Sequence, residues 1–356
     1  MPTRIFVRPR VNRYPVLKHR LTAGRRAALA VILRAEGSAP QEAGAAAVFS
    51  GRGLIGGTVG GGILEAVVAK KAKKALRSKQ PMVFDYSLEE DVSAKEGALC
   101  GGKIKILIDP TPEKDQAAWR SMGRSQETRR PGLLATHIHQ NKSGELTIKR
   151  HWLEGPASRR LKLKPPFSAF KKEILAPGGE SRVRFVERPS EGLFLEPRAP
   201  LPRLIIAGAG HIGRAVCCLG RMLDFEVTAI DDRPEYANRK RFPEADRIIV
   251  RDIGRAVRET ALGADAYLVI VTRGHAHDAE ALRAAIKRPA AYLGVIGSRR
   301  KVRLMRRLFL ERGWATARQW SKVHSPIGLP IGSRSVAEIA VSIAAELVKV
   351  RRGQGI

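Results

Sequence analysis

The segment LIIAGAGHIGRA contains glycines in the spacing that cradles a phosphate group at the start of a helix. Gly208, Gly210 and Gly213 give the pattern G-x-G-x-x-G, with a strand-like run before it and a helical run after it. A second strand-like run ends in Asp231 about twenty residues later, which completes the context of a dinucleotide-binding loop. We expect Gly208 to make the tight turn, Gly210 to admit a phosphate and Gly213 to permit close packing.

This loop predicts a ligand that bears phosphate, because the free N–H groups and partial positive charge of a helix N-terminus favour anions. The candidate ligand-binding residues are Gly208, Gly210, His211, Gly213 and Asp231. The Asp231 carboxylate is of the type that binds a ribose hydroxyl. A Rossmann scaffold whose pocket is empty or reused is the alternative, and the pattern does not identify the nucleotide as NAD.

A polar cluster, Arg273, His275, His277 and Asp278, follows the strand-like run AYLVIVT. It is therefore expected at the carboxyl end of a sheet, where open α/β sheets place their ligands. Two histidines and an aspartate at this spacing suit metal binding or proton transfer. Asp278 is equally suited to cap a helix that begins at Ala279. We favour the functional interpretation of the cluster.

A second anion-friendly helix start follows the strand-like run AYLGVIGS. Ser298 is placed to begin this helix, with Arg299 and Arg300 directly after it. The alternative is a solvated basic face, because arginines continue along the same segment. Further on, His324 and Ser325 are adjacent, and we do not expect a nucleophile pair because adjacent side chains rarely face each other.

The N-terminal half contains a third glycine loop and a cysteine flanked by glycines. GLIGGTVGGGILEAVVAKKAKKAL predicts a strand, a loop and then a helix with lysines on one face. Cys100 precedes the strand-like run KIKILID and is one of three cysteines in the chain. The candidate binding residues of this half are Gly60, Gly61, Gly62, Glu65, Cys100, Gly101 and Gly102.

These motifs are distributed over regions with different patterns. Residues 1–20 are expected to form a basic, loose N-terminal extension, with a transit peptide or a basic tail as the alternative. Residues 21–110 form a glycine-rich α/β domain. Residues 111–198 are a variable middle segment and linker. In it, residues 111–132 are loop-like, LLATHIHQ and ELTIKRHWLEG make a hairpin, and the Pro-rich EGLFLEPRAPLPR marks the boundary. Residues 199–353 alternate strand and helix, which predicts a doubly wound parallel sheet of Rossmann type. Ser335 and Glu338 form a capping box at the last helix.

Composition excludes several classes of protein. The chain has no apolar run long enough to span a membrane and no signal peptide, and its few cysteines indicate a reduced, cytoplasmic protein. The net charge of +31 favours anionic partners. The basic residues are spread along the chain and aromatics are only 5% of it, so nucleic acid is not the expected partner.

Taken together, the motifs resemble the XdhC/CoxI family of accessory proteins for xanthine dehydrogenase-type molybdenum enzymes. The resemblance rests on TRGHAHDAEAL, YLGVIGSRRK, HSPIGLPIG and AEIAVSIAAELV in the C-terminal half, and on GSAP, GGTVGGGILEA and CGGKIKILI in the N-terminal half. It implies a chaperone rather than an enzyme, which binds the molybdenum cofactor (molybdopterin), supports its sulfuration with a cysteine desulfurase and passes it to a molybdenum hydroxylase client. It also implies a homodimer.

The resemblance implies that Cys100 is an accessible thiolate that contacts the sulfurated cofactor, whereas the residues alone favour a small buried side chain. Ile63 stands where the family motif has a second cysteine. A nucleotide is a further expected ligand of the Rossmann domain. The competing hypotheses are an NAD(P)-dependent oxidoreductase that uses His275 or His277 as its acid or base, and a nucleic-acid-binding protein supported by charge alone.

Overall fold

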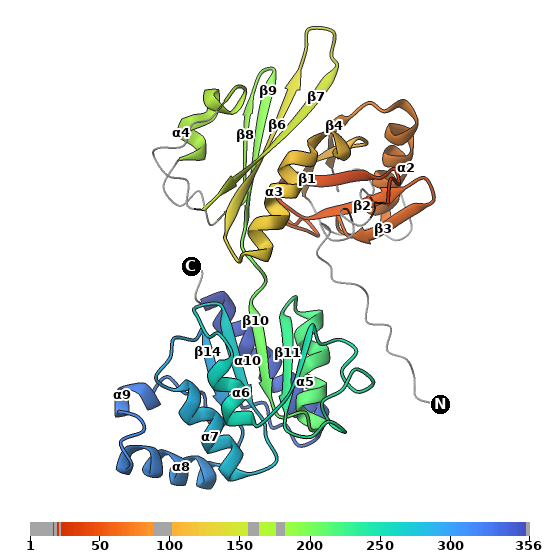
Figure 1. The fold of residues 1–356 in the computed structure, drawn as a ribbon. Coiled ribbons are helices and arrows are strands. Elements are labelled where there is room, and N and C mark those ends of the chain that lie inside the picture. The colour runs from red at the N-terminus through yellow and green to blue at the C-terminus, as the bar shows by residue number, and fades with distance from the viewer. Residues whose placement is uncertain are drawn as a thin grey trace. The chain divides into compact units, whose positions relative to one another are not determined.

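The computed structural model describes residues 23–87, 102–155, 164–175 and 182–353, together with Leu17 and Arg20. Its described residues divide into two compact units, which meet in the sequence between Pro200 and Leu201. Figure 1 shows the units in sequence colours, with most of their strands and helices labelled.

The N-terminal unit begins with an antiparallel sheet covered on one face by a helix. Its strands pair in the order β3-β2-β1-β5-β4, with bounds β1 Ala28–Glu36, β2 Ala46–Ser50, β3 Gly53–Gly57, β4 Met82–Ser87 and β5 Lys103–Asp109. Helix α2 (Gly62–Ser78) follows the glycine loop as predicted and buries Leu64 and Val68 against Ala30 and Ile32 of β1. The alternate residues of β1 face the other way and are also buried, so the central strand is a continuous apolar run.

A second antiparallel sheet packs on that other face within the same unit. Its order is β7-β6-β9-β8, with bounds β6 Gly132–Gln140, β7 Leu146–Glu154, β8 Arg184–Arg188 and β9 Glu191–Arg198. Leu29 and Leu107 of the first sheet share one apolar cluster with Leu134 and Phe194 of the second. A 3₁₀ turn at Phe167–Phe170 and the short helix α4 (Lys171–Ile174) cover the outer face of the second sheet.

The hairpin predicted for the middle segment is confirmed, since β6 and β7 pair in register from Gly132↔Glu154 to Gln140↔Leu146. The loop predicted for residues 111–132 is wrong, because helix α3 (Gln116–Glu127) follows a 3₁₀ turn at Pro112–Asp115. Its apolar stripe is narrow, with Ala118 and Met122 buried in an otherwise polar segment.

Two further predictions for this unit differ from the structure. Strand β9 occupies most of the segment predicted as a Pro-rich boundary, and Leu193, Phe194 and Leu195 are buried on both of its faces. Leu17, which the sequence places in a loose extension, is 1% exposed and belongs to the cluster between the sheets. The other residues of the extension, apart from Arg20, lie outside the described part of the chain.

The C-terminal unit is the predicted doubly wound parallel sheet. Its strands run in the order β12-β11-β10-β13-β14, with bounds β10 Arg203–Ala207, β11 Glu226–Asp231, β12 Arg247–Val250, β13 Ala266–Ile270 and β14 Tyr292–Val295. The helices are α5 His211–Met222, α6 Ile253–Glu259, α7 His275–Ala285, α8 Arg299–Glu311, α9 Ala317–Trp320 and α10 Val336–Gly353. This is the strand order of a Rossmann fold.

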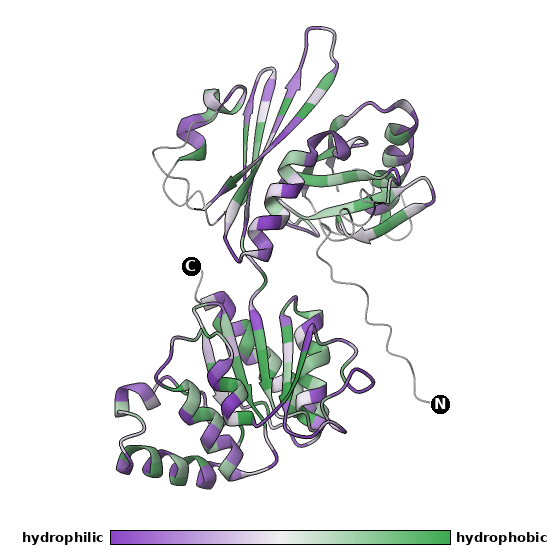
Figure 2. Cartoon of the chain, in the orientation of Figure 1, coloured by the Kyte–Doolittle hydropathy of each residue, from purple (hydrophilic) through white to green (hydrophobic). Residues whose placement is uncertain are grey.

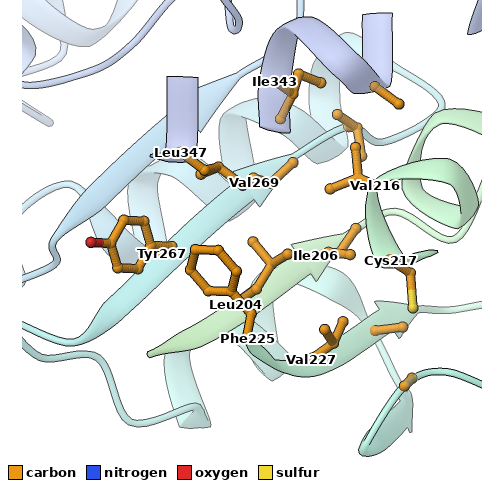
Figure 3. Packing of buried hydrophobic residues seen from close by; sticks show 14 of the residues in the cluster. Leu204, Ile206, Val216, Cys217, Phe225, Val227, Tyr267, Val269, Ile343 and Leu347 are labelled. Carbon is orange, nitrogen blue, oxygen red and sulfur yellow. The ribbon is translucent and has the colours of Figure 1, made fainter. Parts of the chain in front are cut away.

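Each face of this sheet packs against its own set of helices. In one cluster Val216 and Cys217 of α5 and Ile343 and Leu347 of α10 lie over the strands, as Figure 3 shows. On the other face, α6, α7 and α8 contribute to a separate cluster. Figure 2 shows the central strands as mainly hydrophobic and α8 as a helix of mixed hydropathy. The capping box of α10 is confirmed, because Ser335 N–H donates to Glu338 Oε2 and Glu338 N–H donates to Ser335 Oγ, at 2.9 and 3.2 Å.

Candidate functional site

The glycine loop of the Rossmann unit is built around positions where a side chain has no room. Gly208 has φ +115°, and a Cβ there would lie 2.4 Å from the carbonyl oxygen of Val271. A Cβ on Gly213 would lie 2.0 Å from the oxygen of Gly208. At Gly210, by contrast, a Cβ would meet nothing within 4 Å. The loop is therefore tight where it packs and open at the N-terminus of α5, where exposed His211 begins the helix.

Asp231 is a buried carboxylate at the end of β11 that fastens this loop. Its Oδ2 accepts a hydrogen bond of 2.7 Å from Ala209 N–H, and Arg233 donates to both oxygens through Nε and Nη2 at 2.8 and 3.1 Å. Arg233 N–H also donates to Oδ1, at 3.1 Å. Burial raises the pKa of Asp231, but the hydrogen bonds from Arg233 and the backbone amides outweigh it, so the pKa is lowered. The carboxylate is thus ionised and fully engaged.

The residues of the polar cluster after β13 interact with different partners and do not form one site. Arg273 makes a two-pronged ion pair with Asp232 at 2.8 and 3.1 Å, and its guanidinium lies 3.2 Å from His277 Nε2. His275 is exposed at the first position of α7. Asp278 is completely buried and is described below with its own partners. The described residues hold no group of three histidine, cysteine or acidic side chains placed to bind one metal ion.

Asp278 does not cap its helix, which corrects one interpretation of the sequence. Helix α7 begins at His275 with Gly274 as its N-cap, so Asp278 lies inside the first turn. Its carboxylate accepts hydrogen bonds from Thr272 N–H at 3.1 Å and Thr272 Oγ1 at 2.6 Å, and it pairs with the ammonium of Lys301. Asp278 therefore ties the loop after β13 to helix α8.

Ser298 caps α8 as its position predicts, accepting a hydrogen bond of 3.3 Å from Lys301 N–H. Arg299 and Arg300 follow as exposed residues on the first turn. They lie at the same carboxyl edge of the sheet as the glycine loop and the segment after β13, because the strands are parallel. Three chain segments with donors for an anion thus meet at this edge.

The N-terminal unit brings distant glycine motifs together at a second place. Gly60, Gly61 and Gly62 have φ values of +128°, +72° and +53°, which only glycine adopts easily. A Cβ on Gly60 would lie 2.7 Å from the Pro40 side chain, whereas Gly61 and Gly62 face open space. Glu65 on the first turn of α2 accepts a hydrogen bond of 2.9 Å from Thr58 Oγ1.

Gly102, which is distant from Gly60 in the sequence and directly precedes β5, lies against the same turn. A Cβ on Gly102 would lie 2.8 Å from the oxygen of Glu36 and 3.1 Å from Ser38. The turn at residues 36–40 therefore contacts both Gly60 and Gly102. Cys100 and Gly101 lie outside the described residues, so the position of the predicted thiol remains a prediction.

The other two cysteines are not reactive thiols. Cys217 is buried in the core of the Rossmann unit, and burial raises its pKa to about 12. Burial also raises the pKa of Cys218, whose sulfur accepts a hydrogen bond of 2.7 Å from Arg214. A thiol that stays protonated is a poor nucleophile. Cys100 is thus the remaining candidate for thiolate chemistry in this chain.

Sequence reasoning missed several residues of the site. Arg233 and Tyr236 follow Asp231 in the chain, and the guanidinium lies 3.7 Å from the centre of the tyrosine ring. Thr272 and Lys301 hold Asp278. The run DDR, which begins at the last residue of β11, indicates Arg233, but the sequence does not show the orientation of its side chain.

A cavity of about 460 Å³ lies elsewhere in the Rossmann unit, against the amino ends of β10, β11 and β12. Its rim includes Arg203, Glu226 and Arg247, which begin these strands. The cavity extends along these strands, on the side of α6, as far as Arg251 just after β12. The predicted site residues do not line this cavity.

In the described part of the chain, helices are too short or too polar to cross a membrane.

Comparison with known proteins decides the family. The model of the XdhC Rossmann domain matches residues 204–347, and that of the XdhC and CoxI family matches residues 20–87. The chain belongs to the XdhC/CoxI family. The matches cover the glycine loops of both units and thus agree with the motifs quoted from the sequence.

Relatives of this XdhC-family chain include two curated bacterial proteins. The uncharacterized protein YqeB of Escherichia coli is 34% identical over 160 residues, which are 45% of this chain and 29% of YqeB. This chain therefore matches less than a third of the length of that relative. A probable xanthine dehydrogenase subunit of Bacillus subtilis is 25% identical over 331 residues, 92% of this chain and 93% of that protein.

A solved structure has the same fold over nearly the whole length. It is the crystal structure of a xanthine dehydrogenase from Bacillus halodurans, with a TM-score of 0.76 and 23% identity over 96% of each chain. The fold shared with that structure therefore includes the middle segment as well as the two regions matched by the family models.

Proposed function

We propose that this XdhC-family chain is an accessory protein that binds the molybdenum cofactor, supports its sulfuration and inserts it into a xanthine dehydrogenase-type molybdenum hydroxylase. A cysteine desulfurase supplies the sulfur, and the protein acts as a homodimer in the cytoplasm. The family membership supports this role, together with the name of the Bacillus subtilis relative that aligns over 92% of the chain.

The single observation that carries the proposal is the meeting of three family motifs in the N-terminal unit. The turn at residues 36–40 contacts Gly60 and Gly102, and beside it Gly61 and Gly62 leave open space at the start of the 17-residue helix α2. Backbone N–H groups at a helix start of this kind donate hydrogen bonds to a phosphate. Molybdopterin carries a phosphate, so the residues fit the group.

The chain's own residues then have defined roles. The amides of Gly61, Gly62 and Ile63 hold the phosphate, and Glu65 keeps the loop in place through Thr58. Cys100, which precedes Gly102 closely in the chain, would provide a thiolate for contact with the sulfurated cofactor. The cofactor itself supplies the molybdenum centre of the client enzyme.

The test is cofactor retention during co-production with the molybdenum-cofactor pathway. Molybdopterin in the purified protein is measured as its fluorescent oxidation product, in the wild type, Cys100→Ala and Cys218→Ala. Cys218 is a matched control because it is a half-buried thiol of the Rossmann unit that is held by Arg214. We expect retention in the wild type and Cys218→Ala, and loss of most of it in Cys100→Ala.

Two results would contradict the proposal at different levels. Wild-type protein without molybdopterin, although the pathway is active, would remove cofactor binding. Equal retention in both cysteine variants would leave cofactor binding in place and remove the role of Cys100. Transfer is measured separately, as molybdenum incorporated into an apo-hydroxylase mixed with the loaded protein.

A further inference from the structure

The Asp231 carboxylate has no capacity left for a ribose diol. A Rossmann site that binds NAD uses this carboxylate to accept hydrogen bonds from the ribose hydroxyls. Here Oδ1 accepts from Arg233 N–H and Nε, and Oδ2 accepts from Ala209 N–H and Arg233 Nη2. A carboxylate oxygen accepts about two hydrogen bonds, so both oxygens are saturated. A free diol placed here would leave its hydroxyl groups without an acceptor.

The two carboxylates at the end of β11 are each already paired with an arginine. Arg233 pairs with Asp231, and Arg273 pairs with Asp232. Arg241, further along the same loop, has no ion pair among the described residues, and its Nε is buried without a hydrogen-bond partner there. Within the described part of the chain, the positive charge of Arg241 is therefore uncompensated.

Tyr236 contacts both Arg233 and Arg241 in the loop that follows β11. The guanidinium of Arg233 lies 3.7 Å from the centre of the Tyr236 ring, and that of Arg241 lies 5.0 Å from it. Guanidinium groups bind a phosphate dianion through charge-assisted hydrogen bonds, and this loop carries two of them around one tyrosine ring. Arg233 stays held by Asp231, so it offers the phosphate a fixed donor rather than a mobile side chain.

We propose that the Rossmann site of this chain binds a nucleotide that carries a phosphate on its ribose, held by Arg233 and Arg241, in place of a nucleotide with a free ribose diol. The glycine loop binds the diphosphate at the N-terminus of α5. The loop after β11 binds the phosphate on the ribose. This proposal rests on the phosphate-binding role of the Rossmann loop and not on cofactor binding by the N-terminal unit.

The test compares NADPH and NADH, which differ only in the ribose phosphate, by calorimetric titration of the full chain at equal ionic strength. We expect NADPH to bind at least about tenfold more tightly, equivalent to about 1.4 kcal/mol. Arg241→Gln should remove most of this preference. Lys240→Gln is the matched control, because it removes the same charge from the neighbouring exposed residue and should leave the preference within about twofold.

Arg233→Gln gives a second, opposite signature. It frees oxygens of Asp231, so NADPH should bind more weakly while NADH binds more tightly than in the wild type. Equal or tighter binding of NADH by the wild type would overturn the proposal, and so would binding of neither nucleotide. Equal effects of Arg241→Gln and Lys240→Gln would do the same.

Molybdopterin is the other phosphomonoester that these arginines could hold, and the same preparations distinguish it. If the proposal is right, Arg241→Gln retains as much molybdopterin as the wild type. Loss of molybdopterin in Arg241→Gln, without any preference for NADPH, would assign the arginines to the pterin phosphate and overturn the nucleotide proposal. Absence of molybdopterin from every preparation would contradict the proposed function. The nucleotide proposal would then be decided by the comparison of NADPH with NADH.

Discussion

Asp278 and Lys301 form a buried ion pair that joins α7 to α8 at the carboxyl edge of the Rossmann sheet. Asp278 is completely buried, and the Lys301 side chain is 15% exposed. The lysine stem also lies over Gly297, where a Cβ would come within 2.8 Å of its Cδ. The pair therefore fixes the start of α8 relative to the loop that carries Thr272 and Arg273.

Lys301→Met should destabilise the Rossmann unit by about 3 kcal/mol, because it leaves a buried carboxylate without its counter-charge. Urea unfolding gives the change as a lower midpoint. Arg300→Met is the matched control, since Arg300 is exposed, and it should change stability by less than about 0.5 kcal/mol. Asp278→Asn introduced into Lys301→Met should recover part of the loss. A loss no larger than that of the control would show that the pair contributes nothing.

Arg150→Met should destabilise the N-terminal unit by about 3 kcal/mol or more at pH 7. Buried Arg150 on β7 pairs with Asp109 and Asp115, and its Nη1 lies 2.8 Å from Asp115 Oδ2. Without it, two carboxylates remain buried. Arg130→Met removes a guanidinium from an exposed pair with Glu154 and should cost less than about 1 kcal/mol.

The loss in Arg150→Met should shrink as the pH falls. Burial already raises the pKa of Asp115 above its usual value, and Arg150 is the group that opposes this. Its removal raises that pKa further, so the folded state takes up a proton more readily than the unfolded state. A carboxyl group whose pKa is raised in the folded state stabilises the fold at low pH. That contribution is lost as the pH rises through the folded-state pKa. Unfolding curves at pH 5 and pH 7 measure this, and a loss independent of pH would contradict it.

The sequence predicts the Rossmann unit well because its signals are local. Buried strands, the glycine spacing and the capping box of Ser335 and Glu338 each lie within a few residues. Helix α3 escapes prediction because only a narrow stripe of its surface is apolar. Asp278 is misplaced because the first turn of α7 has no buried residue before it, so the pattern points to a start at Ala279.

The candidate site depends on contacts that a linear pattern does not contain. The turn at residues 36–40 contacts Gly60 and Gly102, which are distant from it in the sequence. The saturation of Asp231 depends on the orientation of the Arg233 side chain, which folds back over two residues. The sequence shows that Asp231 and Arg233 are close together in the chain. Only the structure shows that the arginine donates hydrogen bonds to both carboxylate oxygens.

Acid should weaken the N-terminal unit through His137. This imidazole on β6 is 5% exposed, and burial lowers its pKa, with His139 and Lys149 adding to the effect and Glu191 opposing it. A histidine with a lowered pKa favours the folded state when neutral. Its contribution is present above the unfolded pKa of about 6.5 and is lost as the pH falls through the folded value.

The measurement for His137 is the unfolding midpoint between pH 7.5 and pH 5, in the wild type and His137→Phe. Phenylalanine suits the site because Phe167 and Phe170 already contact the ring edge-on. The wild type should lose stability on acidification, by about 1.4 kcal/mol for each unit of difference in pKa. The variant should lose less, since only groups such as His151, whose pKa is also lowered by burial, remain to titrate. Parallel curves would assign the acid effect to other residues.

Gly213→Ala and Gly210→Ala should separate the folding of the Rossmann loop from its binding of phosphate. Gly213→Ala forces a Cβ to within 2.0 Å of the Gly208 oxygen, so it should lower the free energy of unfolding by more than about 2 kcal/mol. Gly210 has φ −70° and open space around it, so alanine fits there at a cost below about 1 kcal/mol. That methyl group nevertheless occupies the space through which a phosphate approaches the amides of α5. Calorimetric titration of folded Gly210→Ala should therefore show at least about tenfold weaker NADPH binding, and unchanged affinity would exclude this loop as the phosphate site.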